Sequence, residues 1–337
     1  MTIDLRSDTL TKPTPAMLEA MMNAEVGDDV FEEDPTIIKL ENKLAVMFGK
    51  EAGLFCPSGT MTNQVAIRIN TQPQDEVICH KYSHVYLYEG GGMMSNSHVS
   101  VKLLEGERGL LDSENIEENI NSDNVHYPKT SLVCLENTMN KGGGSCYDLK
   151  NIAAIRNVCD KNNLRLHLDG ARIFNAIVTK GYSASEIGKF FDTISVCLSK
   201  GLGAPVGSVL LGTNTDIKKA RRVRKSFGGG MRQAGFLAAA GIYALDNHIG
   251  RLAIDHKRAQ HIGQVLQSLS SVKNVYPVET NIIIFETHIP AEEYLQKLST
   301  LGIKAAAFGK YAIRMVFHLD ISDAMMEKME ELLMKGL

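Results

Sequence analysis

The sequence predicts an α/β protein with a mostly parallel, doubly wound sheet. Between about residues 50 and 211, short apolar runs that alternate with small or polar residues are typical of strands, and helical patterns separate them. Strands that alternate with helices form a parallel sheet covered by helices on both faces. The length of 337 residues allows a large domain of this kind and a second, smaller one.

The composition is that of an ordinary globular protein. Hydrophobic residues make up 44% and charged residues 22%, and the net charge is −3. This charge gives no reason to expect nucleic acid or an anionic membrane as a partner. The six cysteines form no Cys-x-x-Cys pair, and neither a signal peptide nor a membrane-spanning run is recognisable, so we expect buried thiols and a cytoplasmic protein.

The first helices are predicted by their caps. Thr14 and Pro15 begin a helix that continues to Asn23, and the pair Asp34-Pro35 begins another that ends at Gly49. The acidic run 27–34 between them lacks the spacing and central glycine of a calcium loop. We expect an exposed acidic turn there, and the sequence identifies no metal site.

An anion site is predicted at residues 58–60. Ser58, Gly59 and Thr60 precede a helical pattern from Gln64 to Ile69. The start of a helix presents free N–H groups and the positive end of the helix dipole, and the two hydroxyls add further donors. The stretch therefore fits a phosphate, although an ordinary capped helix has the same pattern.

Two histidines lie near predicted strands. His84 follows a strand at 76–80, and His126 precedes a strand at 131–135 that a helix at 148–161 follows. An imidazole at such a place can lie over a cofactor ring or exchange a proton near neutral pH. A structural role is the more common one for a histidine, and the chain has 10 of them.

The strongest chemical signal is a pair of charged residues at two strand ends. The strand in 164–168 ends at Asp169, and the strand in 192–198 ends in a glycine-rich turn that carries Lys200. Enzymes that use pyridoxal phosphate need a lysine that forms a Schiff base and a carboxylate that keeps the pyridine nitrogen protonated. In an α/β sheet both residues would lie in the crevice beyond the carboxyl ends of the strands.

The C-terminal part predicts a separate domain. Long helices at 231–246 and 249–269 lead into it, and we place the boundary so that 1–248 form the N-terminal segment and the large domain, and 249–337 the small domain. A strand, a helix, a strand and a helix follow, at 281–285, 291–301, 313–317 and 322–334. Arg314 lies within the second of these strands, where a guanidinium must find an anion, either a structural carboxylate or one of a substrate.

Six motifs, in order, are similar to those of the low-specificity L-threonine aldolases. They are Asp-Leu-Arg-Ser-Asp-Thr at 4–9, Gly-Asp-Asp-Val at 27–30, Ser-Gly-Thr at 58–60, His-Leu-Asp-Gly-Ala-Arg at 167–172, Leu-Ser-Lys-Gly-Leu-Gly at 198–203 and Gly-Gly-Gly-Met-Arg-Gln at 228–233. The resemblance covers nearly the whole chain. It implies the aspartate-aminotransferase-like fold type I of pyridoxal phosphate enzymes.

The resemblance also implies a role for each matching residue. Lys200 would hold pyridoxal 5'-phosphate as a covalent aldimine, Asp169 would pair with its ring nitrogen, and His84 would stack on the ring. The remaining residues fall into three groups: Ser58, Gly59 and Thr60 for the phosphate, Lys225 and Arg232 for the phosphate of a neighbouring subunit, and Ser7, Arg172 and Arg314 for the substrate carboxylate. The shared phosphate site implies a homo-oligomer, usually a tetramer built as a dimer of dimers.

The implied reaction is cleavage of threonine, allo-threonine or another β-hydroxy-α-amino acid into glycine and an aldehyde. His84 and His126 are the candidate bases for the β-hydroxyl proton. Family members often have histidine where this chain has Met139, which cannot carry a proton and leaves the substrate preference open. The alternatives are a β-eliminating lyase, an amino-acid racemase and a protein that only stores or senses the cofactor; a carboxylate clamp argues against the last.

Overall fold

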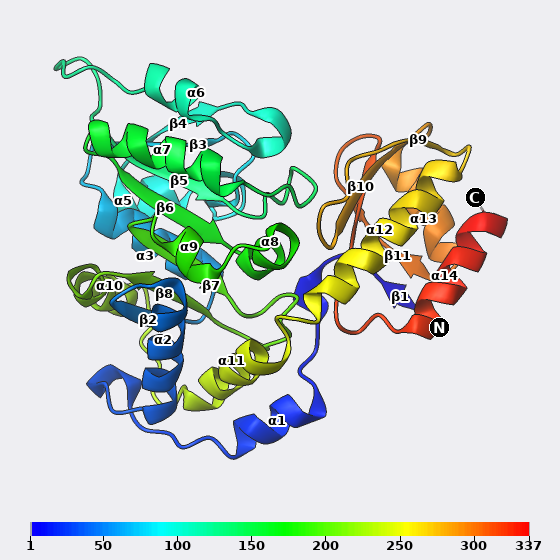
Figure 1. The fold of residues 1–337 in the computed structure, drawn as a ribbon, viewed down its shortest axis with the longest axis horizontal. Helices are drawn as coiled ribbons and strands as arrows, with labels where there is room; N and C mark the ends of the chain where they lie inside the picture. The colour runs from blue at the N-terminus through cyan, green and yellow to red at the C-terminus, as the bar shows by residue number, and fades with distance from the viewer. Residues whose placement is uncertain (1, 337) are drawn as a thin grey trace.

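The computed structural model describes residues 2–336, which form a large domain and a smaller C-terminal domain joined by the long helix α12 (Leu252–Ser268). The two hydrophobic cores are separate, one for each domain. Figure 1 shows the sheet of the large domain between layers of helices, with the small domain to its side.

The large domain contains a seven-stranded sheet in the order β2-β8-β7-β6-β5-β3-β4. Neighbouring strands from β7 to β4 are parallel, whereas β8 is antiparallel to both β7 and β2. The predicted α/β fold with a mostly parallel sheet is confirmed. The strands are β2 (Ala52–Cys56), β3 (Glu76–His80), β4 (Ser100–Leu104), β5 (Thr130–Glu136), β6 (Arg165–Gly170), β7 (Thr193–Cys197) and β8 (Ser208–Gly212).

Helices cover both faces of this sheet because successive strand residues point to opposite sides. In β5, for example, Val133 and Leu135 belong to the main core, while Leu132 and Cys134 belong to a smaller cluster on the other face. The helices of the domain are α1 (Pro15–Met22), α2 (Pro35–Phe48), α3 (Gly59–Asn70), α4 (His84–Leu87), α5 (Gly92–Ser97), α6 (Ser113–Glu118), α7 (Leu149–Lys161), α8 (Ile173–Lys180), α9 (Ala184–Gly188), α10 (Asn214–Ser226) and α11 (Gly235–Asn247), with short 3-10 turns at Asp8–Leu10, Asp29–Phe31 and Glu107–Gly109.

The small domain is built on an antiparallel sheet in the order β12-β13-β10-β9. Its elements after α12 are β9 (Val272–Val275), β10 (Ile282–Thr287), α13 (Ala291–Thr300), β11 (Ile303–Lys304), β12 (Ala306–Ala307), β13 (Ala312–Val316) and α14 (Asp323–Gly336). The first strand, β1 (Ile3–Asp4), pairs in parallel with β11, and Ile3 and Leu5 pack in the core of the small domain. The start of the chain is therefore part of the small domain, while the division at residue 248 stays a prediction.

The acidic run 27–34 is not the fully exposed turn that we expected. Asp34 is completely buried, caps α2 through the N–H groups of Thr36 and Ile37, and accepts a third hydrogen bond from Gly235. Asp29 is 2% exposed and forms an ion pair of 2.8 Å with the buried Arg224. The prediction was wrong for these two acids because partners far along the chain, in α10 and α11, compensate their burial.

Two further predictions concern the cysteines and the absence of a membrane-spanning run. All six cysteines are free and buried, as expected. None of the helices within residues 2–336 combines the length and the apolar character that a bilayer span requires.

Candidate active site

The candidate site is a cavity of about 560 Å³ between the two domains, where β5, β6 and β7 end. Ligands of open α/β sheets bind at this edge. Its lining comes from the N-terminal segment, the ends of the strands and the small domain. The lining residues are Ser7, Thr9, His84, Tyr88, Glu136, Asn140, Lys141, Ala171, Arg172, Lys200, Ala306, Ala307, Phe308, Gly309 and Arg314.

Lys200 and Asp169 belong to the ends of the neighbouring strands β7 and β6, and only Lys200 lines the cavity. Lys200 follows β7 in a turn in which its carbonyl accepts a hydrogen bond from Gly203, at 2.8 Å. Asp169 lies in β6, is 3% exposed and accepts hydrogen bonds from the Nδ2 of Asn63 (3.0 Å) and the backbone N–H of Ala171 (3.1 Å). A buried carboxylate held by two donors suits the charge of a protonated pyridine ring.

His84 begins α4 and lines the cavity. Its Nδ1 lies 2.9 Å from Oε1 of Glu89, whose side chain is fully buried. Burial lowers the pKa of His84, but the hydrogen bond to Glu89 and the charges of Asp169, Glu89 and Glu136 outweigh it, so the pKa of His84 is raised above its usual 6.5. The imidazole is therefore a stronger base than a free one.

Glu136, the last residue of β5, adds a second carboxylate to the cavity wall. Its oxygens accept the backbone N–H groups of His84 (2.8 Å) and Asn140 (2.9 Å). Burial and the nearby charge of Asp169 raise the pKa of Glu136 to about 7. This residue holds the start of α4, and with it His84, against the end of the sheet.

The predicted anion site is the N-terminus of α3. Ser58 is the N-cap, and its Oγ accepts a hydrogen bond from the N–H of Met61 (3.2 Å). Gly59 and Thr60 form the first turn, and Ser58 and Thr60 are both exposed. A side chain at Gly59 would approach only the Oγ of Ser208, at 3.5 Å, so a phosphate can come close to the backbone there.

Arg314 differs from most arginines of the chain because no carboxylate of residues 2–336 forms a salt bridge with it. It donates to the Oδ1 of Asn140 and to the carbonyl of Arg6, each at 2.8 Å, and its buried Nε makes no hydrogen bond. Burial lowers its pKa to about 10. A guanidinium left in this state in a cavity wall is prepared for an anionic ligand.

Arg172 lines the same cavity but already has a partner. Its Nε and one terminal nitrogen donate to the two oxygens of Asp8, both at 2.7 Å, and Asp8 is completely buried. The charge of Arg172 holds the pKa of Asp8 at about 2 in spite of burial. The third guanidinium nitrogen of Arg172, Nη1, forms no hydrogen bond with Asp8.

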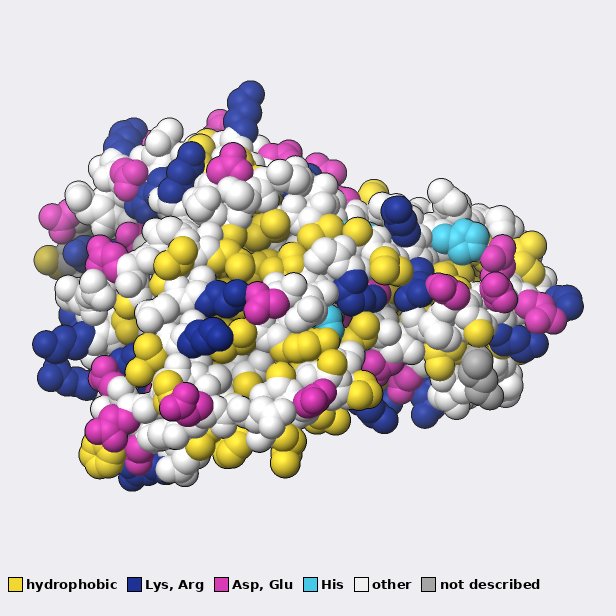
Figure 2. All heavy atoms as spheres, turned by 60° about the horizontal axis from the view of Figure 1, so that its bottom comes forward, with side chains coloured by type: hydrophobic (Ala, Val, Ile, Leu, Met, Phe, Trp, Pro, Cys, Tyr) yellow, Lys and Arg dark blue, Asp and Glu magenta, His cyan; other side chains and the backbone are white. Residues whose placement is uncertain are grey.

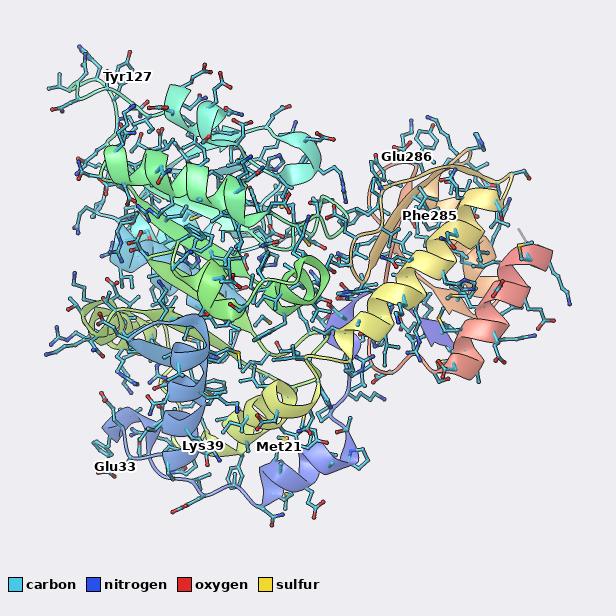
Figure 3. The ribbon with its side chains drawn as sticks, viewed as in Figure 1. Met21, Glu33, Lys39, Tyr127, Phe285 and Glu286 are labelled. Atoms are coloured by element: carbon cyan, nitrogen blue, oxygen red, sulfur yellow. The ribbon has the colours of Figure 1, made fainter. Side chains whose placement is uncertain are left out.

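Seven predicted site residues are not among those that line this cavity. Four of them belong to the elements just described: Asp169 at the end of β6, and Ser58, Gly59 and Thr60 at the start of α3. The other three are Lys225, Arg232 and His126. Lys225 is exposed and borders a separate hollow with Asp29 and Val30, and Arg232 is exposed and paired with Asp28 at 2.9 Å. His126 is exposed in the segment before β5, whereas the cavity lies at the other end of that strand. Figure 3 labels the adjacent Tyr127 at the outer tip of the large domain.

Met139 is completely buried, next to Gly109, and is not part of the cavity wall. Its backbone forms an isolated antiparallel bridge with Ser145. The thioether therefore does not replace a proton carrier in the cavity of this chain.

One group of possible metal ligands exists within residues 2–336: His84, Glu89 and Asp169. The amide of Asn63 donates one hydrogen bond to each of the two carboxylates, at 2.8 and 3.0 Å. An N–H donor between the carboxylates satisfies them without a cation.

Four polar residues of the site region were not predicted from the sequence: Asp8, Asn63, Glu89 and Glu136. Glu136 has the same signal as Asp169, an acid directly after a buried apolar strand. Asp8 lies inside the motif at 4–9, and Asn63 lies shortly after the motif at 58–60. Glu89 has no such signal, since it lies in an irregular stretch before three glycines.

The fold and the site define a class of enzymes, those that use pyridoxal phosphate. The donor set fits the group: Lys200 for its aldehyde, the buried Asp169 for its ring nitrogen and the free N–H groups of α3 for its phosphate. Arg314, which forms no ion pair with a carboxylate of residues 2–336, adds a guanidinium to the wall of the same cavity.

The chain belongs to the beta-eliminating lyase family, which matches residues 4–290. It is 42% identical, over 95% of its length and 92% of the other chain, to low-specificity L-threonine aldolase 1 of Arabidopsis thaliana. It is 41% identical to the low specificity L-threonine aldolase of Escherichia coli K12, with 95% of each chain covered. A solved threonine aldolase of Leishmania major has the same fold, with a TM-score of 0.85, 20% identity and 99% of each chain covered.

The buried pair Asp8–Arg172 predicts a large loss of stability in Asp8→Asn. Because Arg172 would keep a buried charge without a partner, we expect a loss of about 3–5 kcal/mol at neutral pH, measured by urea unfolding. The pKa of Asp8 is lowered from 3.8 to about 2, so the pair stabilises the fold fully above pH 3.8 and the difference from wild type shrinks as the pH falls toward 2. Asp4→Asn, which breaks the exposed pair with Arg6, is the control and should change little. Equal effects of the two substitutions would contradict this account.

Proposed function

We propose that the protein is a pyridoxal-phosphate-dependent L-threonine aldolase, which cleaves L-threonine, L-allo-threonine and other β-hydroxy-α-amino acids into glycine and an aldehyde. The observation that carries this proposal is Arg314, a guanidinium that pairs with no acid of residues 2–336 and lies in a cavity that it shares with Lys200 and His84. The names of the relatives at 41–42% identity support the same substrate.

Five residues are assigned to binding of the cofactor. We assign covalent binding of the cofactor to Lys200, its ring nitrogen to Asp169 and its phosphate to Ser58, Gly59 and Thr60. When bound, pyridoxal phosphate supplies an electron sink for the bond that breaks.

The substrate is held and deprotonated by residues of the cavity wall. Arg314 binds the substrate carboxylate in a charge-assisted pair, with the remaining nitrogen of Arg172 and the hydroxyl of Ser7 beside it. This fixes the orientation of the Cα–Cβ bond. His84 accepts the proton of the β-hydroxyl, the Cα–Cβ bond breaks and the aldehyde leaves. A proton is then added to Cα in place of the lost carbon, so that the remaining amino acid is glycine.

We also propose a homo-oligomer, a tetramer as the resemblance implies, in which Lys225 and Arg232 reach the phosphate site of a second copy. Both are exposed and lie outside the cavity of their own chain, and His126 would likewise have to act on another copy. Figure 2 shows hydrophobic side chains on the face that α1, α2 and α11 help to form, where Leu18, Met22, Ile38 and Phe236 are exposed. Six free cysteines support a cytoplasmic location.

Lys200→Ala tests the cofactor lysine and the reaction together. The wild-type protein should absorb as a yellow cofactor complex and release acetaldehyde from L-threonine, followed by NADH oxidation with alcohol dehydrogenase. Lys200→Ala should lose this activity by roughly 1,000-fold or more. Lys141→Ala, another lysine of the cavity wall, should keep the colour.

The products separate the alternatives. A β-eliminating lyase would form 2-oxobutanoate from threonine, and a racemase would invert the α-carbon without releasing an aldehyde. A protein that stores the cofactor would be yellow and would not change its spectrum with amino acids. Any of these results, in place of acetaldehyde and glycine in equal amounts, would overturn the aldolase proposal.

Arg314→Gln tests the carboxylate site. A hydrogen bond to a charged group contributes about 1.5–3 kcal/mol, so we expect kcat/KM for threonine to fall roughly 10- to 150-fold. Threoninol, which lacks the carboxylate, is the control ligand, and its affinity should change little. A similar loss of affinity for both ligands would show that Arg314 supports the structure and not the carboxylate.

A further inference from the structure

The buried carboxylate of Glu89 has no role in the reaction described so far. We propose that Glu89 is a positioning residue: it holds the ring of His84 with the proton on Nδ1, so that Nε2 is the atom that accepts the substrate proton. This inference rests on the proposed function, since it concerns the base of that reaction.

Glu89 accepts three hydrogen bonds from side chains. They come from His84 Nδ1 at 2.9 Å, Asn63 Nδ2 at 2.8 Å and Gln64 Nε2 at 2.6 Å, and the side chain of Glu89 is fully buried. A carboxylate with three donors is stabilised in its ionised form, and an ionised carboxylate only accepts hydrogen bonds. The proton between the two residues therefore belongs to Nδ1. In the neutral ring Nε2 is then free of a proton, and His84 lines the cavity.

The amide of Asn63 is oriented by a chain of hydrogen bonds that continues through the sheet. Its two N–H groups donate to Glu89 and Asp169, and its Oδ1 lies 3.1 Å from Nε2 of His167. The other ring nitrogen of His167 lies 2.9 Å from Oγ1 of Thr193. Burial lowers the pKa of His167 to about 4, so this ring is neutral. Because the N–H groups of Asn63 face two carboxylates, its Oδ1 faces Nε2 of His167, and Nε2 is therefore the donor. Nδ1 then accepts from the hydroxyl of Thr193, although the carbonyl oxygen of the same residue lies 3.2 Å away.

These hydrogen bonds fix the amide of Asn63 in one orientation. If the amide of Asn63 were reversed, its oxygen would face the carboxylates of Glu89 and Asp169 and its N–H groups would face the donor of His167. Glu89 is thus connected to the carboxylate on the cofactor side of the site, and the positions of both acids depend on α3.

The charges around His84 determine the sign of the expected effect. Glu89 follows α4, Asp169 comes from β6, Glu136 from β5, and the ring of Tyr88 lies 5.5 Å from the imidazole. The cations Lys200 and Arg172 line the same cavity. The hydrogen bond to Glu89 raises the pKa of His84, so loss of this carboxylate lowers that pKa.

The test is the pH dependence of kcat/KM in the holoenzyme of Glu89→Gln, with L-threonine as substrate. The acid limb should move to lower pH by about one unit, because a less basic imidazole loses its proton at lower pH. The plateau should fall about 10-fold or more, as the base is weaker and less well oriented. Glu293→Gln makes the same change at an exposed position on α13 and should leave the profile unchanged.

A lower plateau with an unmoved acid limb would overturn the proposal, since a merely structural residue would produce that result. A second measurement does not depend on the variant. In wild-type protein labelled with 15N-histidine, with the His84 signals assigned by their absence in His84→Asn, the neutral ring should be the Nδ1–H tautomer. The Nε2–H tautomer would contradict the assignment of Glu89. Failure of the wild-type protein to release an aldehyde would instead overturn the proposed function, and the tautomer would still decide the role of Glu89.

Discussion

The structure of the site depends on one buried carboxylate, that of Asp169 at the end of β6. A charge at this depth is tolerated only when donors compensate it, and Asn63 and the N–H of Ala171 do so. Because Asn63 lies in α3, the same contact ties the predicted phosphate site to the strand that carries Asp169. The carboxylate of β6 and the N-terminal part of α3 are therefore connected directly.

A second buried pair connects the N-terminal segment to the site. Asp8 binds Arg172 through two hydrogen bonds and accepts a weaker one from Asn281, at 3.3 Å, just before β10 of the small domain. The N-terminal segment thus contacts both domains, and Arg314 of β13 donates to the carbonyl of Arg6 in that segment. The part of the cavity wall that Arg172 and Arg314 form therefore depends on this short stretch as well as on the sheet.

The parallel sheet could be predicted from the alternation of strands and helices. Asp169 and Lys200 could be predicted as neighbours because each lies at or after the end of a buried apolar strand, and the carboxyl ends of parallel strands meet at one edge. The same rule explains why His126 is absent from the cavity: it precedes β5 and so lies at the opposite edge. Glu89 could not be predicted, since its burial depends on contacts with Asn63 and Gln64 that leave no periodic pattern. The ion pair between Asp29 and Arg224 could not be predicted either, because it joins segments far apart in the chain.

Lys200 is the residue that we propose binds the cofactor. Reduction of the yellow holoprotein with borohydride, followed by digestion and mass spectrometry, locates the lysine to which pyridoxal phosphate becomes permanently attached. We expect the label on the peptide that contains Lys200. A label on Lys141, another lysine of the cavity wall, would contradict it.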